Sequence, residues 1–133
     1  MTAQNPPSLP EVLLIEDDCD TVTILKIWLS DICRLIVAND GETALHILKD
    51  HQEKGSFFKL FLVDINLPVP WSGITLRAEI IENFKEYQFV PFIAETAFVM
   101  PRDQENIRNA GFTDCLFKPL DRLILLSMME QYL

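Results

Sequence analysis

The sequence predicts an open α/β fold in which five parallel strands alternate with five helices, and the helices cover both faces of the sheet. Two observations carry this prediction. Short apolar runs recur along the chain without alternating polar residues, which is typical of strands buried on both faces. Between these runs, apolar residues recur at helical spacing. Strands that alternate strictly with helices form parallel sheets joined by right-handed crossovers.

The first two strand–helix pairs occupy the amino-terminal part of the chain. An apolar run over 11–15 predicts a strand that stops at an acidic triplet. The apolar spacing after it predicts a helix over 19–31. A second strand is expected over 35–38, before a helix that Asp40 caps and Gly55 ends.

The central strand is the apolar run that begins after Lys59 and ends in Asp64. Pro68 prevents this strand from continuing. A carboxylate at the end of an apolar strand is costly unless a cation, hydrogen bonds or chemistry compensates its charge. The helix that follows is marked by four apolar residues, which are Ile74, Ala78, Ile81 and Phe84.

The last two strand–helix pairs follow the same pattern. A strand is predicted over 89–94, and Pro101 suits the first turn of a helix that stops at Gly111. The fifth strand is expected over 112–117, and a final helix over 120–132 completes the fold.

Length and composition indicate one domain over 11–133 after a disordered tail over 1–10, which is rich in proline and has no signal-peptide pattern. No apolar segment approaches the roughly 20 residues that span a bilayer, so we expect a soluble protein without membrane insertion. The net charge of −9 and the lack of a basic stripe argue against direct nucleic-acid binding. Three cysteines without metal-ligand spacing indicate a reducing compartment, the cytoplasm.

Polar side chains gather where the predicted strands end. The carboxyl ends of parallel strands share one edge of the sheet, and ligands of such sheets bind there. If the first and third strands are neighbours, Asp17 and Asp64 converge, and a cation must offset their repulsion. Oxygen ligands with few carboxylates suit Mg²⁺. The candidate residues at this edge are Glu16, Asp17, Asp64, Thr96 and Lys118.

This set of five residues, together with a bound Mg²⁺, has the chemistry needed for phosphoryl transfer. A carboxylate, here Asp64, can attack phosphorus and form an aspartyl phosphate. The metal, the Thr96 hydroxyl and the Lys118 ammonium would neutralise the oxygens of the transferring group. Taken singly, these residues also have structural explanations. Asp17 or Asp18 could cap the helix over 19–31, and Thr96 could cap the helix that follows its strand. Lys118 could pair with an acid on the surface. Their placement at one edge favours the functional interpretation.

As an ordered set, four segments resemble the receiver domain of two-component response regulators over roughly 11–133. These segments are LLIEDD at 13–18, LFLVDINLP at 60–68, PFIAETA at 91–97 and GFTDCLFKPL at 111–120. The resemblance implies a flavodoxin-like, doubly wound (βα)5 fold with strand order 2-1-3-4-5.

The resemblance also implies roles for individual residues around the metal. Asp64 matches the phosphoacceptor, and Asp17 matches a direct Mg²⁺ ligand. Glu16 matches an acid that acts through metal-bound water. Asn66 would contribute its backbone carbonyl to the metal.

Three further residues match positions that contact or border the phosphoryl group. Thr96 matches the switch hydroxyl, and Lys118 matches the lysine that contacts the phosphoryl group. Ala97 matches the small residue beside the site.

By the same resemblance, the chain is a signalling phosphoacceptor and not an enzyme, because it catalyses only transfer to its own aspartate and its own dephosphorylation. The donor would be the phosphohistidine of a sensor histidine kinase or a phosphotransfer protein, or a small acyl phosphate. Phosphorylation would change the surface that meets a downstream effector. We expect this effector to be a separate partner or a region outside the sequence given.

Departures from the family pattern fall near the predicted switch. Cys115 stands where the family usually has a switch aromatic, so Phe98 or Phe117 could take that place. The loop after the central strand is one residue longer than the common pattern and contains Trp71, which we expect to pack against the next helix. Lys59 stands where an acid is common.

Two other functions remain open at this point. A degenerate receiver would keep the fold as a phosphorylation-independent interaction module. A phosphatase similar to the haloacid dehalogenase family would use the same residue types, but Asn66 stands where that family has its second aspartate. A dinucleotide-binding domain is disfavoured, because Asp17 and Asp18 follow the first strand in place of a glycine-rich turn.

Overall fold

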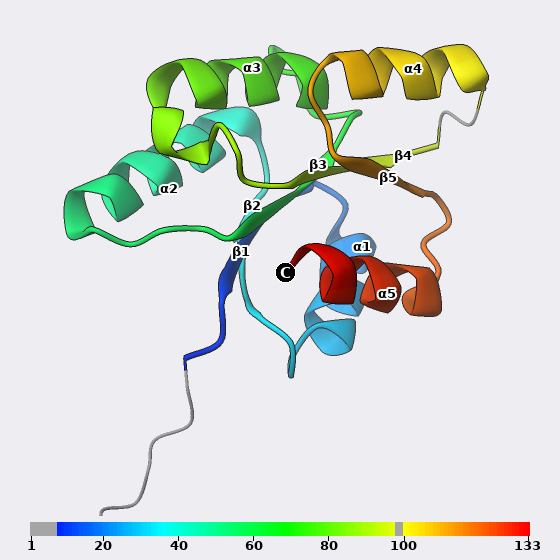
Figure 1. The fold of residues 1–133 in the computed structure, drawn as a ribbon, viewed down its shortest axis with the longest axis horizontal. Helices are drawn as coiled ribbons and strands as arrows, with labels where there is room; N and C mark the ends of the chain where they lie inside the picture. Colours follow the sequence, from blue (N-terminus) through cyan, green and yellow to red (C-terminus); the bar gives the residue numbers. More distant parts are fainter. Residues whose placement is uncertain (1–7, 98–99) are drawn as a thin grey trace, which may run out of the picture.

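The computed structural model describes residues 8–97 and 100–133 and confirms the predicted fold class. Five parallel strands form one sheet in the order β2-β1-β3-β4-β5 (Figure 1). The strands are β1 (Glu11–Ile15), β2 (Arg34–Ala38), β3 (Leu60–Asp64), β4 (Phe92–Thr96) and β5 (Asp114–Phe117). The helices are α1 (Cys19–Trp28), α2 (Gly41–Lys54), α3 (Gly73–Asn83), α4 (Pro101–Asn109) and α5 (Arg122–Tyr132), with a short 3₁₀ helix, η1 (Lys85–Tyr87).

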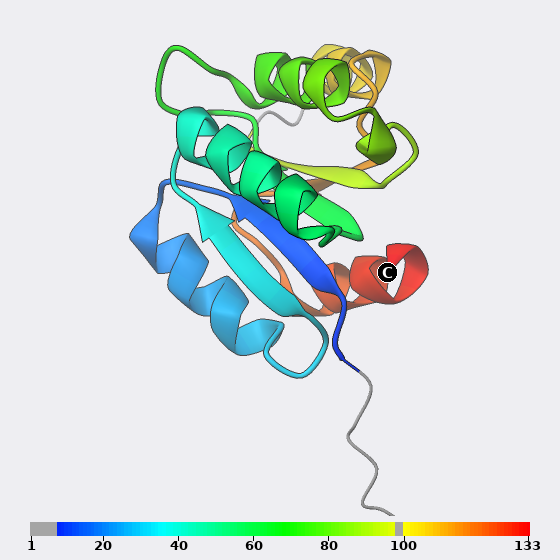
Figure 2. The ribbon, with the colours of Figure 1, turned by 90° about the vertical axis from the view of Figure 1, so that its left-hand side faces the viewer.

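The helices lie in two layers, one on each face of the sheet. Helices α2, α3 and α4 pack on one face, and α1 and α5 pack on the other (Figure 1). Figure 2 shows α1 and α2 on opposite sides of the β2 edge. Both faces of β3 are therefore covered, and all five of its residues are buried. This double burial explains why β3 reads as a continuous apolar run that ends in Asp64.

Most of the predicted element ends are correct to within one to three residues. Asp40 caps α2 by accepting a hydrogen bond from the backbone N–H of Thr43, as predicted. Helix α1 ends at Trp28 and not at residue 31. Leu29 is its C-cap, and the backbone N–H of Leu29 donates the last helical hydrogen bond to the carbonyl of Leu25. The last helix begins at Arg122, where Asp121 is the N-cap, and not at residue 120.

The prediction of a strand over 89–94 was wrong at its start. Strand β4 begins at Phe92, and the side chain of Phe89 is 92% exposed. The preceding residues form η1, and the backbone N–H of Val90 bonds to the carbonyl of Tyr87 to close that turn. Strand β5 also begins two residues later than predicted, because the backbone N–H of Phe112 bonds back to Ile107 in α4.

The inward face of α3 also differs from the prediction. Leu76 and Ile80 are its buried apolar residues, whereas Ala78 is exposed. Trp71, in the loop before α3, packs against the core as predicted. A Cβ atom at Gly41 would overlap the Trp71 ring, so the indole fills the space above the start of α2.

An arginine joins α3 to the carboxyl end of α4. The Arg77 guanidinium lies 4.9 Å from the centroid of the Phe92 ring. Its Nη1 donates a hydrogen bond of 3.0 Å to the backbone carbonyl of Ala110, directly after α4. On the next strand, the Phe61 ring stacks on Phe92 with 4.2 Å between centroids. Side chains from β3, β4 and α3 thus form one continuous contact that ends at α4.

We expect Gly73→Ala to destabilise the protein, because Gly73 packs directly against the backbone at the end of β3. A Cβ atom there would lie 2.5 Å from the carbonyl oxygen of Asp64 and 2.8 Å from Cα of Ile65. Backbone atoms cannot move aside as a flexible side chain can, so urea titration should show a loss of about 1–3 kcal/mol in the free energy of unfolding. Glu82→Ala, on the exposed part of α3, should change it by less than about 0.5 kcal/mol. Equal stability of Gly73→Ala and the wild type would show that α3 can retreat from β3 at no cost.

Candidate functional site

Three carboxyl groups lie side by side at the carboxyl edge of the sheet. Asp64 is paired in register with Glu95 of β4. Ile15 is paired with Val63, so Glu16 comes next to Asp64 on the other side. Because side chains alternate along a strand, these three share the face of Leu14, Leu62 and Ile93, which is covered by α1 and α5. All three carboxyl side chains are buried.

A cavity of about 300 Å³ opens above this edge. It brings together six of the seven residues predicted for the site, and Asp18 besides. Its lining residues are Asp17, Asp18, Asp64, Asn66, Thr96, Ala97 and Lys118. The seventh predicted residue, Glu16, is fully buried beside this cavity.

Both carboxylate oxygens of Asp64 are held in place. The backbone N–H of Asn66 donates to Oδ1 at 2.9 Å. On the other side, Nζ of Lys118 donates to Oδ2 at 3.0 Å. These two bonds fix the orientation of a carboxylate that sits where β3 meets its loop.

Lys118 is shared between two acids, because its Nζ also lies 3.5 Å from Oε1 of Glu16. Burial disfavours the charged ammonium, but the hydrogen bond to Asp64 and the charges of Glu16, Asp64 and Glu95 outweigh this effect. Together they raise the pKa of Lys118 above its ordinary value, so this lysine remains charged at neutral pH.

The structure also decides which acid caps α1. Asp18 is the N-cap, and its carboxylate accepts a hydrogen bond of 3.0 Å from the backbone N–H of Thr21. Asp17 is exposed and belongs instead to a cluster with Glu16 and Asp64. One oxygen from each of these three side chains lies within 4.8 Å of the other two. The capping alternative therefore applies to Asp18 and not to Asp17.

The cluster of Glu16, Asp17 and Asp64 fits a small, hard cation. Its donors are all oxygens, which is the ligand chemistry that Mg²⁺ prefers. In addition, Oε1 of Glu16 is buried and accepts no hydrogen bond from the described residues. The backbone N–H of Asp18 occupies only the other oxygen, at 3.3 Å. The one ammonium near this oxygen, Nζ of Lys118 at 3.5 Å, is shared with Asp64, so further positive charge among the three acids would be favourable.

Thr96 is the last residue of β4 and is buried. It does not cap the next helix, because the N-cap of α4 is Met100. In register it lies beside Phe117 of β5. The alternative role of Thr96 as a helix cap is thus excluded, and Thr96 lines the wall of the cavity.

The structure shows the position of Cys115, which stands where the family usually has a switch aromatic, and of Phe117, one of its two candidate replacements. Cys115 is half-buried on β5 and contacts the core on the α4 side of the sheet. Phe117, two residues further, is partly exposed and lines a small cavity with Gln104 and Arg108 of α4. Phe98 lies outside the described residues. Whether Phe117 replaces the usual aromatic stays a prediction.

The sequence interpretation missed one residue of the site, Glu95. Burial, then contact with Glu16, then the charges of Glu16 and Asp64, raise the pKa of Glu95 well above that of an ordinary glutamate. The only signal in the sequence was a single acid among the apolar letters of β4. That signal was lost because the strand was expected to end at Ala94, one residue before Glu95.

The buried acids predict that stability falls as the pH rises in the absence of divalent cations. Burial and the neighbouring Asp64 raise the pKa of Glu16 to about 7, so the folded state keeps a proton that the unfolded state releases from about pH 4.5. Stability from this proton is complete below pH 4.5 and is lost as the pH passes 7. Urea titrations with EDTA from about pH 5 to about pH 8 should show a loss of up to about 3 kcal/mol.

Glu16→Gln is the matched control for this pH dependence, because the amide keeps the shape of the side chain and does not titrate. Its stability should change less with pH than that of the wild type. A flat wild-type profile, or an unchanged slope in Glu16→Gln, would contradict the assignment of the proton to Glu16.

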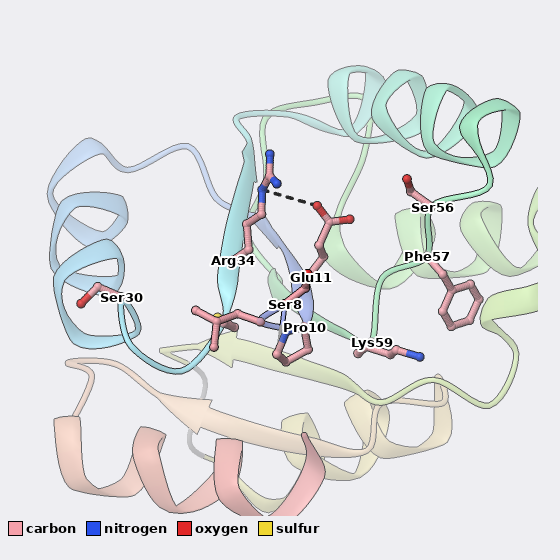
Figure 3. Close-up of a pocket in the computed structure, with 10 residues that line it drawn as sticks. Ser8, Pro10, Glu11, Ser30, Arg34, Ser56, Phe57 and Lys59 are labelled. Carbon is pink, nitrogen blue, oxygen red and sulfur yellow. Dashed lines mark ion pairs between the residues drawn. The ribbon is translucent and has the colours of Figure 1, made fainter. Parts of the chain in front are cut away.

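A larger cavity, of about 770 Å³, lies at the opposite edge of the sheet, near the amino ends of β1 and β2 (Figure 3). Its charged groups already have neighbours that compensate them. Nε of Arg34 lies 3.6 Å from Oε2 of Glu11, and Nζ of Lys59 lies 5.3 Å from the centroid of the Phe57 ring. The convergence of acids with a shared lysine is found at the smaller cavity, which is therefore the candidate site.

Comparison with known proteins places the sequence beside one family. The sequence model described as the response regulator receiver domain matches residues 12–130. An uncharacterised 14.6 kDa protein of Leptolyngbya boryana is 31% identical, with 92% of this chain and 88% of that protein covered. The aerobic respiration control sensor protein ArcB of Escherichia coli is 30% identical over 91% of this chain, which spans only 15% of the length of ArcB.

Solved structures agree with the fold. The chemotaxis protein CheY4 of Vibrio cholerae superposes with a TM-score of 0.81 at 24% identity, covering 95% of this chain and all of that one. The receiver domain of a sensor histidine kinase from Pseudomonas aeruginosa, solved with a magnesium ion coordinated in its active-site cleft, gives a TM-score of 0.77 at 28% identity. That comparison covers 94% of this chain and 98% of the other. Across residues 8–97 and 100–133, no helix combines the length and apolar character needed to cross a bilayer.

Proposed function

The chain belongs to the response regulator receiver domain family of two-component systems, and from this premise we propose that Asp64 is its phosphoacceptor. One observation carries the proposal. The carboxylate of Asp64 stands at the end of a buried strand, is oriented by Asn66 and Lys118, and borders the 300 Å³ cavity that the other predicted residues line. An oriented carboxylate beside a fixed ammonium is prepared for nucleophilic attack on phosphorus.

The proposed donor is the phosphohistidine of a sensor histidine kinase or of a phosphotransfer protein. One oxygen of Asp64 forms a bond to phosphorus while the bond from phosphorus to the donor's imidazole nitrogen breaks. The electron pair of that bond stays on the imidazole, which takes up a proton as it leaves. Lys118, 3.0 Å from Asp64, offsets the negative charge of the phosphoryl oxygens, and the Thr96 hydroxyl can donate a hydrogen bond to one of them.

We further propose that the site takes Mg²⁺ as its cofactor. Glu16, Asp17 and Asp64 would hold the ion, and the backbone carbonyl of Asn66 would complete the protein ligands. When bound, the ion supplies the positive charge that lets several acids and a phosphoryl group share one small cavity. The magnesium ion in the active-site cleft of the Pseudomonas relative supports this choice.

The output of this reaction would be a changed surface for a downstream effector. Receiver domains act as signalling phosphoacceptors, so turnover of an external substrate is not expected. We propose a cytoplasmic location, because a kinase-linked phosphoacceptor must reach its donor there and all three cysteines are unpaired.

The test is intact-protein mass spectrometry after incubation with Mg²⁺ and a small acyl phosphate or phosphoramidate. We expect the gain of one phosphoryl group that hydroxylamine removes, and peptide mapping should place it on Asp64. A parallel sample with EDTA should gain none, since the acids would repel the incoming phosphate.

The alternatives give different results in this experiment. A degenerate receiver would gain no mass under conditions that modify an established receiver. A phosphatase of the haloacid dehalogenase type would release phosphate from a phosphate ester with many turnovers. Either result would overturn the proposed function.

A further inference from the structure

Phe117, at the end of β5, is an aromatic side chain that the proposed transfer reaction does not use. In the sheet it is paired in register with Thr96 of β4. Because side chains alternate along a strand, Thr96 shares a face with Ala94, and Phe117 shares a face with Cys115. Ala94 and Cys115 both contact the core beneath α2, α3 and α4. Thr96 and Phe117 are therefore neighbours across two strands, on the face that α4 covers.

A cavity of about 90 Å³ lies between β5 and α4. Gln104 and Arg108 line it from α4, and Cys115 and Phe117 line it from β5. A cavity of this volume has room for roughly three water molecules. The space is left open beside Cys115, whose side chain is small.

The Phe117 side chain is 39% exposed, although this cavity lies beside it. Removing apolar surface from water is favourable, and a void beside a packed core lacks the contacts that a filled one makes. A rotation of the ring into the cavity would bury apolar surface and fill the void together. The fold thus offers the ring a second position, beside Cys115.

The two neighbouring side chains border two different cavities. Thr96 lines the cavity of Asp64, and Phe117 lines the cavity beneath α4. A change in the position of Thr96 therefore alters the space available to the Phe117 ring. This pair of side chains connects the phosphoacceptor site with α4.

We propose that phosphorylation of Asp64 moves the Phe117 ring into the cavity beside Cys115, where it packs against α4. This inference rests on the proposed function, in which the Thr96 hydroxyl donates a hydrogen bond to a phosphoryl oxygen. A phosphoryl group shifts the ring only if it interacts differently with the two ring positions. Thr96 supplies the difference, because a side chain drawn toward the phosphoryl group withdraws from Phe117 and leaves space for the inward position.

The test follows the Phe117 ring by NMR in protein with labelled phenylalanine rings. Mg²⁺ is present throughout, and beryllium fluoride is added as a stable analogue of a phosphoryl group on an aspartate. A soluble paramagnetic probe should broaden the Phe117 resonance less after the addition, because the ring leaves the solvent. The matched control is Phe89, which is 92% exposed near the amino end of β4, and its broadening should not change.

Two variants separate the ring movement from phosphorylation itself. Cys115→Leu fills the cavity, so the Phe117 ring should stay exposed when beryllium fluoride is added. Phe117→Ala should lose the amide shifts in α4 that beryllium fluoride causes in the wild type. Neither residue lines the cavity of Asp64, so both variants should still gain a phosphoryl group by mass spectrometry. Cys115→Val, which adds less volume, is used if overpacking unfolds Cys115→Leu.

Three results would overturn the inference and leave the proposed function intact, provided that the wild type gains a phosphoryl group on Asp64. They are an unchanged exposure of the Phe117 ring, an inward movement that persists when Cys115 is replaced by leucine or valine, and α4 amide shifts that survive in Phe117→Ala. A wild type that gains no phosphoryl group would overturn the proposed function together with the inference.

Discussion

Asp64→Asn is expected to abolish phosphorylation completely while the domain stays folded. The amide has the size of the carboxyl group but is not a nucleophile toward phosphorus. It can still accept a hydrogen bond from the backbone N–H of Asn66, and it removes one negative charge from beside Glu16. Intact-protein mass should show no phosphoryl gain, and the midpoint of thermal unfolding should be at or above that of the wild type.

Asp18→Asn is the matched control for this variant. Asp18 lines the same cavity, but its role in the structure is to cap α1, and asparagine caps helices equally well. Asp18→Asn should therefore be phosphorylated at close to the wild-type level. Residual phosphorylation of Asp64→Asn would move the acceptor to another acid, and an unfolded Asp64→Asn would show that the carboxylate is needed for the structure.

Lys118→Met should be the variant with the next largest effect, because Lys118 contacts two buried acids. The methionine keeps the apolar stem and removes the ammonium, which lies 3.0 Å from Asp64 and 3.5 Å from Glu16. Without it, the rate of phosphorylation should fall about 100-fold, as when one donor to a transition-state oxygen is removed. The measurement is the time course of phosphoryl gain at saturating Mg²⁺.

The same substitution should lower the free energy of unfolding at neutral pH by about 2 kcal/mol. This is less than for a fully buried pair, because the Lys118 side chain is 28% exposed and water screens it in part. Lys59→Met, at the other edge of the sheet, should leave both the rate and the stability unchanged. An Lys118→Met protein that is phosphorylated as fast as Lys59→Met would remove Lys118 from the reaction.

The fold and most of the site could be predicted because their signals are local in the sequence. A strand buried on both faces reads as an apolar run wherever it occurs, and the run before Asp64 is of this kind. Once the strands are parallel, the residues that follow them must meet at one edge. The meeting of Asp17 and Asp64 further requires the first and third strands to be neighbours, which the resemblance implied and the sheet order β2-β1-β3-β4-β5 confirms.

The errors arose where a side chain's surroundings depend on distant parts of the chain. Phe89 and Val90 read as the start of a strand, but the turn made by η1 keeps them outside the sheet. Ala78 was expected on the inner face of α3, but that face is formed by Leu76 and Ile80, and Ala78 is exposed. Glu95 became a site residue only through its register with Asp64, which no local pattern specifies.

The contact between Arg77 and the end of α4 has a consequence for motion. Nη1 of Arg77 secures the carbonyl of Ala110, while no side chain of the described residues caps the amino end of α4 at Met100. A displacement of this helix would thus be a rotation about its carboxyl end, with the largest travel near Pro101. Amide hydrogen exchange in α4 should be slowest near Asn109, and Arg77→Leu should speed exchange at that end of the helix.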